Sequence, residues 1–209
     1  MTILDDLSAE PELKQVCARM GFKPNRADIP NSMKPLVEEA IHLGRELLEP
    51  RTCFDFHPIG NIEPDRIEIN PNFSIQSEKV FRWMDGCNGL YLAAVTIGPE
   101  LDQKVAQLSS SGEVTRAFLL NAYGAEAAEA LMNTLNKRIT GLAEERNLAT
   151  TKRYSPGYGD WSITAQKELL ETLQAHRIGI HLTETYLMIP EKSISAIIGT
   201  RSAENREER

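Results

Sequence analysis

The residues best suited to chemistry stand together at 153–161, which read Arg-Tyr-Ser-Pro-Gly-Tyr-Gly-Asp-Trp. Ser155 precedes a proline, so its backbone is pushed toward extended conformations. The Pro-Gly pair that follows favours a tight turn, in which Gly157 can take a positive φ or let a ligand approach the backbone closely. A cation at Arg153, turn amides and a flanking aromatic at Tyr158 would suit a small ligand with a carboxylate and a flat ring. A surface turn with ordinary packing aromatics explains the same nonapeptide equally well.

Two acidic residues upstream are a second candidate. Glu126 and Glu129 lie three positions apart in a segment of small residues, so they share one face of a helix. Neither has a Lys or Arg three or four positions away within that helix. The two acids therefore need water, a cation from elsewhere in the chain, or a cationic ligand. A simply solvated helix face is the alternative.

A downstream segment makes a family resemblance specific. Residues 178–199 read Ile-Gly-Ile-His-Leu-Thr-Glu-Thr-Tyr-Leu-Met-Ile-Pro-Glu-Lys-Ser-Ile-Ser-Ala-Ile-Ile-Gly. The ordered pair Arg-x-Ser-Pro-Gly-Tyr and Leu-Thr-Glu-Thr…Met-x-Pro-x-x-Ser-Ile-Ser-Ala resembles the activation domain of cobalamin-dependent methionine synthase. It is more similar still to the short stand-alone proteins related to that domain. The match covers about residues 120–199.

The resemblance implies a ligand and a set of contacts. In that family the domain binds S-adenosylmethionine, whose methyl group rescues an oxidised, inactive cobalamin. By the same comparison Arg153 would pair with the methionine carboxylate, and Ser155 and Gly157 would offer backbone groups. Aligning Leu-Asn-Lys-Arg-Ile at 135–139 puts Glu129 at a ligand-binding glutamate.

The chain also departs from the family pattern. The family uses an aspartate from its N-terminal part, in a sequence not found here, and a tyrosine beyond the last strand, where this chain becomes charged after Gly199. Gly-Asp-Trp at 159–161 replaces an alanine- and proline-rich continuation. Tyr158 and Trp161 could stack on the ligand's ring, although packing against the next helix is the commoner outcome for such aromatics.

The function that the resemblance implies is S-adenosylmethionine binding in the reductive methylation, or reactivation, of a cobalamin bound to a separate methionine synthase or corrinoid methyltransferase. A flavodoxin-like protein would donate the electron. Cobalt is the nucleophile and the sulfonium is already a good leaving group, so no catalytic acid or base is assigned and the chain's status as a methyltransferase-type enzyme stays open. One alternative is a non-catalytic docking subunit of a corrinoid protein complex. Another is a cleft for a different small carboxylate.

The composition of the 209 residues is that of a soluble globular protein, with 41% hydrophobic and 25% charged residues, and we expect it to be cytoplasmic. No run of about 18 apolar residues suggests a membrane span, and the N-terminus does not resemble a signal peptide. A net charge of −7 argues against nucleic-acid binding. Three scattered cysteines and four histidines lack ligand spacing, so we expect free thiols and no metal site.

Hydrophobic periodicity places these motifs on an α+β fold, a twisted antiparallel β-sheet flanked by helices. We expect one domain over 1–200, with an N-terminal helical part at about 1–50, and a disordered tail at 201–209. A turn-rich loop is expected at 23–32. The remaining elements are helices at about 11–20, 33–48, 100–109, 113–142 and 163–177, and strands at 53–56, 67–69, 89–97, 180–189 and 193–199, the last two forming a hairpin about Pro190.

Overall fold

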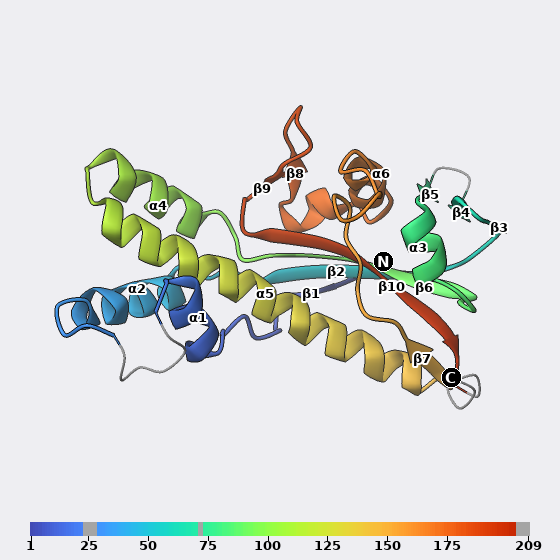
Figure 1. The fold of residues 1–209 in the computed structure, drawn as a ribbon, viewed down its shortest axis with the longest axis horizontal. Helices are drawn as coiled ribbons and strands as arrows, with labels where there is room; N and C mark the ends of the chain where they lie inside the picture. Colours follow the sequence, from blue (N-terminus) through green and yellow to red (C-terminus); the bar gives the residue numbers. More distant parts are fainter. Residues whose placement is uncertain (23–28, 71–72, 204–209) are drawn as a thin grey trace.

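The computed structural model describes residues 1–22, 29–70 and 73–203 of the chain. Its centre is a five-stranded antiparallel sheet with the strand order β1-β2-β6-β10-β7. Helices lie against both faces of this sheet (Figure 1). The α+β prediction is therefore confirmed. The sheet is formed by β1 Thr2–Leu4, β2 Arg51–Pro58, β6 Gly89–Thr96, β7 Leu148–Thr150 and β10 Ser193–Ser202.

Strand β6 occupies the middle of the sheet because both of its faces are apolar. All eight of its residues are buried, and it pairs over its full length with β2 on one side and β10 on the other. Alternate side chains point to opposite faces of a strand. Tyr91, Ala93 and Val95 accordingly join one core, whereas Leu90 and Leu92 join the other. The predicted buried central strand at 89–97 is confirmed.

One face of the sheet is covered by helix α5, Val114–Glu144, which spans 31 residues and confirms the helix predicted at 113–142. Small residues let its neighbours approach closely. A β-carbon on Gly44 would lie 2.2 Å from the ring of Tyr123, and one on Gly124 would lie 2.5 Å from Leu101. The other helices on this face are α1 Leu13–Arg19, α2 Lys34–Glu46 and α4 Glu100–Ser110. We call this side of the molecule the helical face.

The opposite side, which we call the loop face, is covered by short elements joined by turns. Its core packs Trp161 and Leu169 against Leu92 and Ile197 of the sheet. A three-stranded sheet and a two-stranded hairpin also belong to this side (Figure 1). The elements are β3 Ile62–Glu63, β4 Arg66–Asn70, β5 Phe73–Gln76, α3 Glu78–Trp83, α6 Ala165–Thr172, the 3-10 helix η2 Ala175–Ile178, β8 His181–Leu182 and β9 Met188–Ile189.

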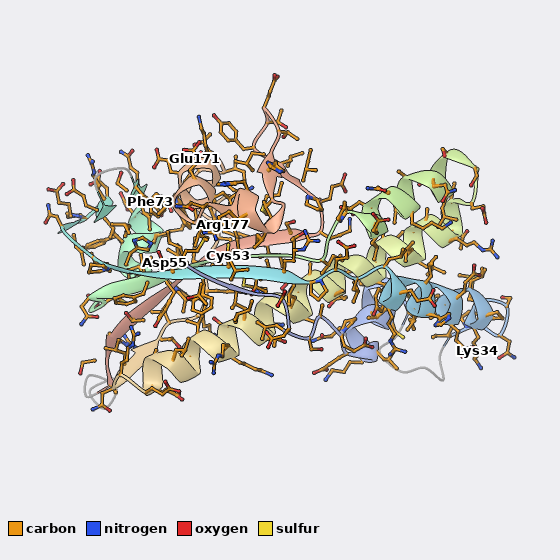
Figure 2. All side chains as sticks on the ribbon, turned by 180° about the vertical axis from the view of Figure 1, so that it is seen from behind. Lys34, Cys53, Asp55, Phe73, Glu171 and Arg177 are labelled. Atoms are coloured by element: carbon orange, nitrogen blue, oxygen red, sulfur yellow. The ribbon has the colours of Figure 1, made fainter. Side chains whose placement is uncertain are left out.

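All three cysteines are free thiols, as predicted, and the structure buries each of them. Figure 2 shows Cys53 on β2 with Asp55 and Arg177 near it. Burial raises the pKa of Cys53 to about 12 and the pKa of Cys87 to about 11. Both thiols are therefore protonated near neutral pH, and the reactive thiolate form is scarce.

In the part of the chain that the structure describes, no helix is both long and apolar enough to cross a membrane. No group of three or more His, Cys, Asp or Glu side chains in the same residues is arranged to hold a metal ion.

The C-terminal hairpin prediction is wrong. Strand β8 pairs with β9 around a turn closed by Thr183 and Leu187, where the Leu187 amide also donates to Oγ1 of Thr183 at 3.0 Å. Strand β10 instead lies between β6 and β7. The central strand offers a full-length apolar partner, so burial outweighs the short sequence separation on which a hairpin prediction depends.

Other differences concern the ends of elements. The helix predicted at 163–177 is interrupted by Gln174, which has φ of 48°, although Gly179 stops the segment with φ of 85° as expected. The region predicted to be helical at about 1–50 begins with β1. The tail predicted at 201–209 is ordered through Ser202, the end of β10, while 204–209 and most of the predicted loop at 23–32 lie outside the described residues. The division into one domain stays a prediction.

Candidate functional site

A cavity of about 520 Å³ lies beside the first residues of β10. On its outer edge β10 is paired with β7 only from Thr200 onward and bridged to Tyr154 at Ile197. The residues before that bridge, among them Ser193 and Ser195, therefore border the cavity instead of a further strand in the described chain. Helix α5, the segment after β7 and helix α6 supply its other walls.

The shortest polar contact among the described residues that line this cavity joins two charged residues that the sequence singled out. Nη2 of Arg153 donates to Oε2 of Glu129 at 2.5 Å. The side chains are partly accessible, with 27% of Arg153 and 40% of Glu129 exposed. Nη1 of Arg153 is buried and has no hydrogen-bond partner among the described residues. Glu129 comes from the middle of α5 and Arg153 from the segment after β7, so the pair joins two elements across the cavity wall.

The turn predicted after Arg153 forms as expected. Gly157 has φ of 88°, and its amide donates to the carbonyl of Trp161 at 2.9 Å. The amide of Tyr158 donates to the carbonyl of Ser155 at 3.3 Å. Positive φ is costly for residues with a β-carbon, which explains the glycine here. The Gly157 N–H is therefore used inside the turn and is not directed into the cavity.

Asp160 and Trp161 anchor this turn to the loop face. Asp160 Oδ1 accepts a hydrogen bond from Ser77 Oγ at 2.5 Å, and its Oδ2 accepts from the Lys79 amide at 3.3 Å. The bond from Ser77, which itself caps α3 by accepting from the Val80 amide, lowers the pKa of Asp160. Trp161 is 2% exposed and packs in the core with α6. Asp160 and Trp161 thus fix the turn beside Arg153 to α3 and to the core of the loop face.

A buried glutamine forms the floor between β10 and the β8–β9 hairpin. Gln166 of α6 is 5% exposed, accepts from Ser195 Oγ at 3.2 Å and donates to the carbonyl of Tyr186 at 2.9 Å. Near the start of β10, Lys192 Nζ pairs with Asp102 of α4 at 3.1 Å. Helices from both faces thus hold the strand that lines the cavity.

Four of the five predicted ligand-binding residues line this cavity: Glu129, Arg153, Ser155 and Tyr158. The fifth, Gly157, is absent from the lining, and its role is to shape the turn. Tyr158 is 68% exposed, whereas Trp161, the other aromatic considered for stacking, is buried.

Sequence reasoning missed Gln166, Ser193 and Ser195 as parts of the wall. The two serines stand in the Ser-Ile-Ser-Ala motif that carried the resemblance, and their alternate spacing in a strand places them on one face. That spacing was the available signal. Gln166 had none, because its role depends on the distant Tyr186 and Ser195.

The other acid of the helix also finds a cation from elsewhere in the chain. Glu126 pairs with Arg19 of α1. Arg19, Glu126 and Glu129 border a shallow groove beside the main cavity. Both glutamates thus pair with an arginine from elsewhere in the same chain. A separate cavity of about 450 Å³ between α6, η2 and the β8–β9 hairpin contains none of the predicted ligand-binding residues.

Comparison with known proteins agrees with this architecture. Residues 85–205 match the family described as "Vitamin B12 dependent methionine synthase, activation domain". Among solved structures, the chain is similar to the MetH reactivation domain, whose crystal structure was determined bound to AdoHcy. That similarity has a TM-score of 0.72 at 17% sequence identity, and it covers 95% of this chain and 78% of the other.

The fold thus defines an α+β protein of the methionine synthase reactivation-domain type. Because the family match spans more than half of its residues, the chain belongs to the activation-domain family of vitamin B12-dependent methionine synthase.

Proposed function

We propose that this chain binds S-adenosylmethionine and acts in the reductive methylation that reactivates a cobalamin carried by a separate methionine synthase or corrinoid methyltransferase. The observation that carries the proposal is the meeting of Arg153 and Glu129 in one cavity, in a chain of this family. The crystal structure of the MetH reactivation domain bound to AdoHcy supports it, because AdoHcy is S-adenosylmethionine without the methyl group.

The residues present fit S-adenosylmethionine in charge and size. The ligand carries a carboxylate, an ammonium and a sulfonium, and the cavity offers one guanidinium and one carboxylate. The side chain of Arg153 is 27% exposed in the cavity wall, and its guanidinium is the group that a ligand carboxylate would contact. The cavity volume of about 520 Å³ lies within the range of small-molecule sites.

Each wall of the cavity has a separate task in this proposal. Arg153 holds the carboxylate end, and Glu129 stabilises positive charge. Tyr158 offers an exposed ring face beside the turn. Ser193 and Ser195 line the wall from β10, where their hydroxyl groups donate to the carbonyl of Pro190 and to Gln166, respectively, and so fix the shape of the wall. The sulfonium supplies an activated methyl group and a reduced corrinoid supplies the nucleophile, so the chain's residues need only bind and orient the ligand.

The first experiment is titration calorimetry with S-adenosylmethionine. We expect wild type to bind and Arg153→Ala to raise Kd about 10- to 100-fold, since a bond to a charged carboxylate is lost. Arg19→Ala is the matched control, because Arg19 pairs with the neighbouring Glu126 and is not part of the main cavity wall. Its Kd should stay within about twofold of wild type.

The second experiment tests transfer. The chain, a corrinoid protein with oxidised cobalamin, a one-electron reductant and S-adenosylmethionine labelled in the methyl group are combined, and label on the corrinoid is measured. Transfer that depends on Arg153 supports the proposal. If the calorimetry of the first experiment detects no binding of S-adenosylmethionine to wild-type protein, that result contradicts the proposal. It favours instead a docking subunit that does not bind the ligand productively. Binding without transfer would leave ligand recognition standing and contradict the role in reactivation.

A further inference from the structure

A second cavity lies on the loop face, between α6, the 3-10 helix η2 and the β8–β9 hairpin. Its volume of about 450 Å³ is within the range of small-molecule sites. None of the residues that line it also lines the main cavity. Figure 2 labels one of them, Glu171 of α6, on the side of the sheet away from α5. The second cavity is therefore a separate feature of the molecule.

Two opposite charges on α6 face this cavity without pairing. Lys167 and Glu171 are exposed, and no hydrogen bond or ion pair joins either side chain to another described residue. They lie four positions apart, so helix geometry makes them neighbours on one face. The comparable residues of α3, Glu78 and Arg82, do pair at 3.1 Å. There the acid precedes the base, which is the favoured order, whereas on α6 the base comes first. Both charges of α6 are thus available to a ligand.

Apolar and polar groups complete the lining. Leu170 of α6 and Ile180 before β8 are 6% and 2% exposed and form an apolar floor. His181 and Glu184 of the hairpin are exposed on the other wall, and their side chains also have no hydrogen-bond or ion-pair partner among the described residues. A neutral imidazole both donates and accepts a hydrogen bond. The second cavity therefore combines a buried apolar floor with polar groups of both charge signs around it.

The walls of the second cavity are held by contacts that leave these charged groups unused. The Tyr186 amide donates to the Thr183 carbonyl at 3.0 Å, and the Tyr186 carbonyl accepts from Gln166 Nε2 at 2.9 Å. Tyr186 has φ of 63°, and Gln174, next to η2, has φ of 48°. Such angles are unfavourable for residues with a β-carbon and are concentrated at binding sites in proteins. The hydrogen bonds hold the hairpin in place, so the cavity is formed before a ligand binds.

From these contacts we infer that the second cavity is a binding site for an α-amino acid with an apolar side chain. Lys167 binds the carboxylate, Glu171 binds the ammonium, and the apolar side chain covers Leu170. Residues four apart on a helix have β-carbons about 5–6 Å apart, so two long side chains can converge on groups that share one carbon. A ligand with one charge would engage only one of them. The inference is independent of the proposed function, because the two cavities share no lining residue.

Nuclear magnetic resonance titration of the ¹⁵N-labelled full chain tests this site with four probes. L-leucine has all three groups, whereas leucinamide lacks the carboxylate, 4-methylpentanoate lacks the ammonium and glycine lacks the apolar side chain. We expect L-leucine to bind with a Kd on the order of 1 mM and to shift amide signals of α6, η2 and the hairpin. Each of the other probes should bind about fivefold more weakly, since the charged groups are solvated.

Variants on the exposed face of α6 assign the two charges. Lys167→Gln should weaken L-leucine about fivefold and remove its advantage over leucinamide, whereas Glu171→Gln should remove its advantage over 4-methylpentanoate. Glu168→Gln is the matched control, because Glu168 is exposed on the same helix and does not line the cavity. Its Kd should stay within about twofold of wild type. Thermal unfolding of each variant checks that the fold is intact.

The outcomes separate this site from the main cavity. Absence of saturable signal changes with L-leucine overturns the inference, as do changes confined to residues of the main cavity. Equal binding of all four probes overturns it too, because the charges and the floor would then make no difference. Failure of S-adenosylmethionine to bind in calorimetry overturns the proposed function alone, since L-leucine binding at the second cavity is measured independently.

Discussion

The two faces of the central sheet are built by different means. On the helical face, one helix of 31 residues packs small and apolar side chains against β6 and β10, with glycines where neighbours approach most closely. On the loop face, short elements and turns are held by specific polar contacts, such as Ser77 to Asp160 and Gln166 to Tyr186. The cavity lies where the two faces meet at the edge of β10.

This difference indicates that the two faces have different roles. Periodic burial gives a stiff support, and turns supply side chains at angles that regular elements cannot provide. Glu129 comes from the helical face, and Arg153 comes from the segment that leads into the turn. Changes in the buried core of the helical face should therefore alter stability more than ligand binding, whereas changes on the loop face should alter ligand binding at a smaller cost in stability.

The largest effect is expected from Leu131→Ala on the helical face. Leu131 is fully buried in the core beneath α5. Its truncation should lower the free energy of unfolding by about 3 kcal/mol, as apolar transfer and cavity costs add. Chemical denaturation measures this change, and calorimetry of the folded protein should show a nearly unchanged ligand affinity. A large loss of affinity at unchanged stability would contradict the proposed division.

A glycine pair gives the next effect. Gly44→Ala would place a β-carbon 2.2 Å from the Tyr123 ring, so we expect destabilisation by about 2 kcal/mol from overpacking. Gly141→Ala on α5 is the matched control, because its added β-carbon would have no described atom within 4 Å other than those of its own stretch of helix. That control should stabilise the protein by about 0.5 kcal/mol through helix propensity. Denaturation midpoints of the two variants moving in the same direction would be inconsistent with close packing at Gly44.

High pH should weaken the helical face. Burial raises the pKa of Tyr123 to about 12, above the ordinary value of about 10. A group whose pKa is raised on folding contributes stability that is complete below its unfolded pKa and is lost as pH rises through the folded pKa. Stability should therefore fall by roughly 2 kcal/mol between about pH 10 and 12. Tyr123→Phe should lack this fall, and an identical fall in that variant would refute the assignment.

Low pH should weaken the loop face, by less. The hydrogen bond from Ser77 lowers the pKa of Asp160 below its usual range. Its contribution is present above the unfolded pKa of about 4 and is lost as pH falls through the folded value. Because the carboxylate is exposed to solvent, we expect only a small shift in the acid unfolding midpoint of Asp160→Asn.

The same Asp160→Asn variant should weaken S-adenosylmethionine binding measurably, since the turn beside Arg153 loses its anchor to α3.

Much of this fold follows from local patterns. The apolar run at 89–97 predicted a central strand, and helical periodicity predicted α2, α4 and α5 within a few residues. The predictions fail where the local sequence pattern is weak and the pairing depends on residues far away in the chain. Strands as short as β1 and β7 have too few residues to show a periodic pattern. Strand β10 pairs with β6 and not with β9, its neighbour in sequence, because β6 offers a longer apolar pairing surface.

The sequence by itself determined the positive φ of Gly157, the helix that carries Glu129 and the absence of a cation on that helix, because backbone sterics and short-range spacing act within a few residues. Only the tertiary structure decided which cation each glutamate meets, that Ser193 and Ser195 face a cavity, and that Asp160 is used for anchoring. Those contacts join residues far apart in the chain. Their geometry is set by how the sheet and helices pack, which no local pattern encodes.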